Sequence, residues 1–68
     1  MPFRVYEAML AQRDSLERVQ AARRAIERAG GAIKFAPPTA SGMVLVTLIL
    51  PDRHTPQEFL PDLPFYPA

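Results

Sequence analysis

The sequence predicts a small α+β domain, built as one β-α-β-β unit with a Pro-rich C-terminal arm. Three observations support this class: an apolar stripe at helical spacing, a nearly continuous apolar run at residues 43–50, and a clustering of proline after that run. We assign residues 1–51 to the β-α-β-β core and residues 52–68 to the arm. The chain has 68 residues, which is too few for a second domain.

The first two elements follow from the spacing of apolar residues. Residues 3–9 alternate between two sets of side chains and include aromatic and β-branched residues, which predicts a strand. Residues 14–29 are expected to form a helix whose apolar residues recur at steps of three and four. This stripe consists of Leu16, Val19, Ala22, Ile26 and Ala29. Asp14 is a candidate cap at the helix start, and Gly30 ends the helix because glycine adopts the left-handed conformation at low cost.

Two more strands complete the predicted sheet. Residues 32–36 form a short alternating strand, whereas residues 43–50 are apolar on both faces and therefore belong at the centre of the sheet. A right-handed crossover through the helix gives the spatial order 1-3-2, in which the first and second strands are parallel and the third is antiparallel between them. One helix covers one face of this three-stranded sheet. The arrangement is a split β-α-β unit, which is half of a ferredoxin-like fold.

The arm is expected to begin with a short helical turn. Thr55, Pro56 and Glu58 combine a cap, a proline at the first helical position and an acidic third residue, which predicts a turn near residues 56–60. Residues 62–68 carry apolar side chains between prolines, a pattern typical of extended polyproline II geometry.

The predicted core has one more apolar sheet face than its helix can cover. Chains below roughly 70–80 residues rarely stabilise a core without disulfides, a metal or oligomerisation, and this chain has no Cys and only one His. Its hydrophobic content of 49% therefore favours a homo-oligomer, with a dimer preferred. The second sheet face is covered either by the arm of the same chain or by a second subunit. The expected interaction residues are Met43, Leu45, Ile49, Phe59, Leu60, Leu63, Phe65 and Tyr66.

Charge and composition argue against several classes of partner and cofactor. The formal net charge is +1, which gives no basic footprint for nucleic acid, and the helix arginines alternate with acidic residues at i+3 and i+4. The longest apolar run is too short for a membrane helix and no secretory signal is recognisable, so we expect a cytoplasmic protein. No metal-ligand or nucleophile spacing is recognisable, and we expect neither a metal nor another cofactor.

Pro2 supports an alternative of the enzyme class. If Met1 is removed, the chain begins with a secondary amine on a strand that leads into a helix. Over its first 29 residues, this opening resembles the tautomerase superfamily built on an amino-terminal proline. The resemblance implies a trimer- or hexamer-forming β-α-β unit in which Pro2 is the general base for keto–enol chemistry and Arg13 or Arg53 binds a carboxylate. The chain departs from that pattern after the helix, where residues 33–35 and a Pro-rich loop replace one long parallel strand.

The function that we expect from the sequence is that of a small homo-oligomeric interaction or regulatory module without catalytic residues. In this interpretation Pro2 is an ordinary second residue. The tautomerase-like enzyme, with Pro2 as its general base, is the alternative.

Overall fold

The sheet is organised around β3, Met43–Pro51, which lies between β1, Phe3–Ala11, and β2, Ala32–Phe35. A computed structural model describes residues 2–11 and 14–68, without the side chains of residues 14 and 15. β3 is antiparallel to both of its neighbours. Its nine residues are apolar apart from Thr47, so both faces of this central strand carry apolar side chains.

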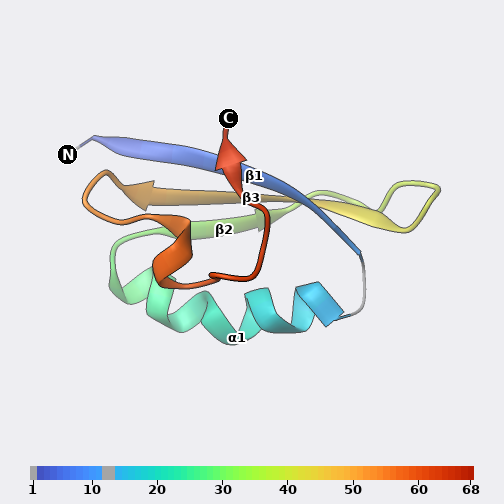
Figure 1. Cartoon of the computed structure of the whole chain (residues 1–68), viewed down its shortest axis with the longest axis horizontal. Coiled ribbons are helices and arrows are strands. Elements are labelled where there is room, and N and C mark those ends of the chain that lie inside the picture. The colour runs from blue at the N-terminus through green and yellow to red at the C-terminus, as the bar shows by residue number, and fades with distance from the viewer. Residues whose placement is uncertain (1, 12–13) are drawn as a thin grey trace.

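The helix α1, Asp14–Arg28, crosses one face of the sheet between β1 and β2 (Figure 1). Its end is a Schellman motif, in which the N–H of Gly30 donates to Glu27 O and the N–H of Gly31 donates to Ile26 O. Gly30 has a φ of +92°, the left-handed conformation that the sequence predicted for it. The predicted capping role of Asp14 concerns a side chain outside the described part of the chain.

The sheet has four strands, so the prediction of a three-stranded sheet is wrong. β4, Tyr66–Pro67, pairs antiparallel with the outer edge of β1, and the order is β2-β3-β1-β4. The N–H of Ala68 extends this pairing by donating to Val5 O at 2.9 Å. The free backbone groups along the outer edge of β1 explain the addition, since an unpaired edge readily accepts another strand. Proline in β4 is compatible with an edge position, where its missing N–H breaks no pairing. The protein is thus a small α+β domain with one helix and a four-stranded antiparallel sheet.

The core lies between this sheet and α1. Even-numbered residues of β1 and β3 share the helix-facing side, with Ala8 opposite Val46 and Leu10 opposite Val44. These side chains are buried together with Val19 and other residues of α1. The complete buried core consists of Ala8, Leu10, Val19, Ile26, Ile33, Val44, Val46, Leu48, Leu50, Leu60 and Phe65.

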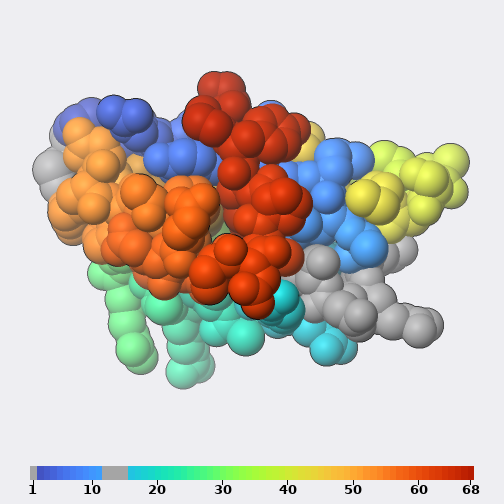
Figure 2. Space-filling model, in the orientation of Figure 1, coloured from blue at the N-terminus to red at the C-terminus, as the bar shows by residue number. Residues whose placement is uncertain are grey.

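The C-terminal segment, residues 52–68, packs on the same sheet face as the helix. Leu60 and Phe65 belong to the core that α1 covers, and Figure 2 shows the segment lying along the helix and reaching β1. Asp62 Oδ2 lies 2.6 Å from Arg18 Nη2 of the helix, although both side chains are exposed. Of the two alternatives for the second sheet face, coverage by the C-terminal segment of the same chain is therefore wrong for the part of the segment that packs in the core.

The width of the sheet explains this placement. Strands about 4.8 Å apart make a four-stranded face roughly 15–20 Å wide, whereas one helix has a diameter of about 10 Å. A strip of apolar sheet beside α1 is left over, and the C-terminal segment fills it. The chain enters this strip through η1, Pro56–Glu58, a short 3-10 helix at the position where the sequence predicted a helical turn.

We expect Phe65→Ala to lower the free energy of unfolding by about 3 kcal/mol, because it removes a buried aromatic ring from the core. Tyr66→Ala is the matched control, since Tyr66 is the adjacent aromatic residue and is 49% exposed; its cost should be about 0.5 kcal/mol or less. Urea unfolding followed by circular dichroism measures both variants. Equal effects would contradict the placement of the C-terminal segment in the core.

Candidate functional site

The sheet face turned away from α1 is the candidate site. The strand register places odd-numbered residues of β1 and β3 on this face, together with even-numbered residues of β2 and Tyr66 of β4. We call it the open face. It consists of Phe3, Val5, Glu7, Met9, Ala11, Ala32, Lys34, Met43, Leu45, Thr47, Ile49, Pro51 and Tyr66.

The open face is mainly apolar and accessible to solvent. Phe3 is 53% exposed, and Val5 and Met9 are each 41% exposed. Leu45 and Ile49 of the neighbouring β3 are only partly buried. An antiparallel sheet with one face in water ordinarily carries polar residues on that face. A mainly apolar surface in this position is instead typical of a binding surface.

One polar row crosses the middle of this apolar surface. In the register of the sheet, Glu7 of β1 lies opposite Thr47 of β3, and Thr47 lies opposite Lys34 of β2. The next paired positions toward one end are Val5, Ile49 and Ala32, and Met9 and Leu45 are paired on the other side of the row. The open face therefore has an acidic group and a basic group on opposite sides of its centre, with apolar blocks above and below.

The structure divides the interaction residues that the sequence predicted between the two sides of the sheet. Four of them lie on the open face, namely Met43, Leu45, Ile49 and Tyr66. The other four lie on the helix side, in the core or against it, namely Phe59, Leu60, Leu63 and Phe65.

Sequence reasoning missed the contribution of β1 to the open face. Phe3, Val5 and Met9 are among its most exposed apolar residues. Their two-residue spacing was a usable signal, since alternate residues of a strand share one face. The pattern of the predicted strand at residues 3–9 does not say which set of side chains meets the helix, so it does not identify the exposed face.

Pro2 and Arg53, the residues of the enzyme alternative, lie at one end of the sheet. The N–H of Asp52 donates to Pro2 O at 3.2 Å, so Arg53 follows directly after a residue that contacts Pro2. Both Pro2 and Arg53 are exposed. Arg13 lies outside the described residues. The fold therefore brings Pro2, the predicted base, and Arg53, one residue predicted to bind a carboxylate, to the same exposed corner of the sheet.

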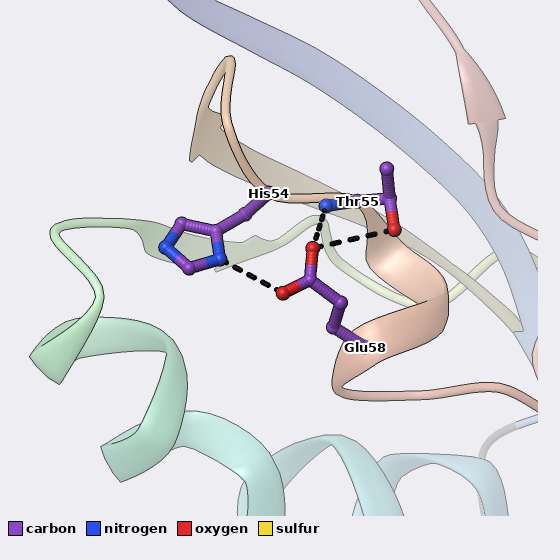
Figure 3. A network of polar contacts seen from close by, with 3 residues as sticks. All are labelled: His54, Thr55 and Glu58. Carbon is purple, nitrogen blue, oxygen red and sulfur yellow. Dashed lines mark hydrogen bonds and ion pairs between the residues drawn. The ribbon is translucent and has the colours of Figure 1, made fainter.

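His54, Thr55 and Glu58 form a polar network in the turn after β3 (Figure 3). Glu58 Oε1 lies 3.0 Å from His54 Nδ1, and Glu58 Oε2 accepts a 2.6 Å hydrogen bond from the backbone N–H of Thr55. The His54 ring also packs against Phe59, with 5.7 Å between ring centroids. These contacts stabilise the turn that leads the chain back along the helix, and they give His54 and Glu58 a structural role.

The hydrogen bond with His54, followed by that from the Thr55 N–H, lowers the pKa of Glu58 below its ordinary value of 4.5. Among the described residues, no three His, Asp or Glu side chains are grouped to hold a metal ion. A shallow pocket of about 280 Å³ lies at the outer edge of β1, lined by Arg4, Val5, Tyr6, Pro67 and Ala68. Arg4 is the one charged side chain in its lining, so the pocket does not combine an acidic and a basic side chain.

Comparisons with known proteins do not place the chain in a family. Searches of protein-family models, of curated proteins and of solved structures gave no significant match. Within the described part of the chain, no helix is long and apolar enough to cross a membrane. The function must therefore be argued from the geometry of the open face and of the corner at Pro2.

We expect acid to destabilise the wild-type protein more than a Glu58→Gln variant. The pKa of Glu58 is lower in the folded state than in the unfolded state, so its stabilising contribution is complete above about pH 4.5 and is lost as the pH falls through the lowered pKa. Urea unfolding at about pH 5 and pH 3 measures this difference. Glu17→Gln, on the exposed surface of α1, is the control and should follow the wild type. Parallel pH profiles for wild type and Glu58→Gln would exclude this role.

Proposed function

We propose that the protein is a small, non-catalytic interaction or regulatory module of the cytoplasm that acts as a homo-oligomer, preferably a dimer, through its open face. The observation that carries this proposal is the exposure of Phe3, Val5 and Met9 on a sheet face that the helix and the C-terminal segment leave uncovered. Burial of that apolar surface by a second copy removes it from water, which is the main favourable term in association. We also propose that the β-α-β-β core corresponds to half of a ferredoxin-like fold.

The size of the open face supports a modest self-association. Nine-residue strands are about 30 Å long and three strands about 14 Å wide, so the outline of the face is roughly 400 Å² per copy. Two such faces together outline roughly 800 Å², below the about 1,200–2,000 Å² that specific stable interfaces bury in total, which is the range of weak associations. We therefore expect a dimer that dissociates at micromolar concentration.

A charged substitution on the open face is expected to abolish this association. In Val5→Lys, dimerisation would have to bury an unpaired ammonium group, and we expect the dissociation constant to rise at least tenfold. Ala25→Lys is the matched control, because Ala25 is exposed on α1. Sedimentation velocity over about 1–500 μM measures association, and far-UV circular dichroism verifies that both variants fold.

Two results would contradict the proposal. One is a wild-type protein that stays monomeric across the whole concentration range. The other is a Val5→Lys variant that is folded and dimerises as strongly as the wild type, since this would place the interface elsewhere on the molecule.

The tautomerase-like enzyme is the second candidate, and one observation favours it. The hydrogen bond from Asp52 N–H to Pro2 O keeps Arg53 near Pro2. A tautomerase-like site needs a base and a residue that binds the substrate carboxylate close together. The exposure of both residues weighs against it, because general-base catalysis by an amine depends on a lowered pKa, which burial promotes.

We expect the protein not to catalyse keto–enol interconversion. We also expect that its function does not require a free amine at Pro2. Intact-mass spectrometry reports whether Met1 is retained, and the interconversion of an α-keto acid and its enol is followed by ultraviolet absorbance. Pro2→Ala should leave oligomeric state and stability unchanged. Removal of Met1 together with turnover that Pro2→Ala abolishes would establish the enzyme instead.

A further inference from the structure

The polar residues of the open face are arranged as a single row. Each of the three neighbouring strands contributes one polar side chain to this face: Glu7 from β1, Thr47 from β3 and Lys34 from β2. Every other position of these strands on the open face is apolar. A face in contact with water has no reason to collect its polar residues in one row, whereas a face buried by a partner needs few polar groups in defined places.

The two charges of this row have no partner within the described part of the chain. The ion pairs there are Arg18–Asp62 and His54–Glu58. Glu7 and Lys34 flank Thr47 on opposite sides, so their strands are two spacings, or about 10 Å, apart. The row therefore presents an acid and a base that form no ion pair with any other described residue.

We propose that two copies stack their open faces about a two-fold axis that runs parallel to β3 and passes over Thr47. This inference rests on the dimer proposed above and specifies its geometry. Rotation about that axis exchanges the positions of β1 and β2, so Glu7 of each copy lies opposite Lys34 of the other. Sheets packed face to face are about 10 Å apart, a gap that extended Glu and Lys side chains span together.

The same axis matches the sizes of the neighbouring apolar residues. In the row formed by Val5, Ile49 and Ala32, the rotation brings Val5 of one copy over Ala32 of the other and Ile49 over Ile49. Large side chains thereby face small ones on either side of a central pair, which is how packed sheets interdigitate.

The other two-fold arrangement of stacked faces is disfavoured by charge. An axis across the strands, through the same row, places Glu7 over Glu7 and Lys34 over Lys34. Like charges directly opposed in an interface are strongly unfavourable. Among stacked faces with aligned strands, the polar row thus favours the two-fold axis parallel to β3. Its role is specificity, since desolvation offsets much of the attraction in a buried ion pair.

Charge exchange tests this geometry. Glu7→Lys and Lys34→Glu should each weaken homodimerisation at least tenfold, because each creates two like-charge pairs in the dimer. The double variant Glu7→Lys/Lys34→Glu restores both cross pairs and should return to within about threefold of the wild-type dissociation constant. Glu17→Lys is the control for Glu7→Lys, with the same change in net charge at an exposed site on α1.

A mixture of the two single variants gives a second readout. The Glu7→Lys chain carries two lysines in the row and the Lys34→Glu chain carries two glutamates, so the heterodimer has opposite charges in both cross pairs. Native mass spectrometry of an equimolar mixture should show the heterodimer in clear excess over either homodimer.

The outcomes separate this inference from the proposed function. Wild-type dimerisation that Val5→Lys abolishes, combined with single charge reversals that have no effect or a double variant that fails to recover, would overturn the geometry and leave the interaction module standing. A wild type without any dimer would overturn both. Circular dichroism of each variant distinguishes a lost interface from a lost fold.

Discussion

The structure depends on one constraint: β3 is apolar on both faces, and the described part of the chain contains a single α-helix. The helix-facing residues of β3, from Val44 to Leu50, are almost completely buried. Met43, Leu45 and Ile49 on its other face are only partly buried. Because apolar surface is unfavourable in water, the position of every other element can be understood from how it covers, or fails to cover, the two faces of this strand.

The C-terminal segment helps α1 to cover one of the two apolar faces. A helix is too narrow to cover a sheet of this width, and Leu60 and Phe65 fill the strip that remains beside α1. The same segment ends in β4, which satisfies part of the free edge of β1. The turn held by His54 and Glu58 directs the chain into this path. Residues that look like a separate arm in the sequence thus complete the core of the domain.

The open face is the apolar side of β3 that neither α1 nor the C-terminal segment covers. In the dimer that we propose, its apolar blocks would supply the driving force for association, whereas Glu7, Thr47 and Lys34 in the polar row would set the orientation of the two copies. This division is common in protein interfaces, where buried apolar area does not discriminate well between orientations and charges do. In such a dimer the sheet would become an inner layer, with a helix and a C-terminal segment on each outside surface.

The sequence by itself determined the α+β class, the single helix and its glycine end, because these depend on local spacing of apolar residues and on the conformational freedom of Gly30. It also identified β3 as apolar on both faces. Only the tertiary structure decided that the C-terminal segment lies beside the helix, that β4 extends the sheet, and that Glu7 and Lys34 flank Thr47. The physical reason is that strand register and the choice of sheet face join residues far apart in the chain, and periodicity within one segment contains no information about either.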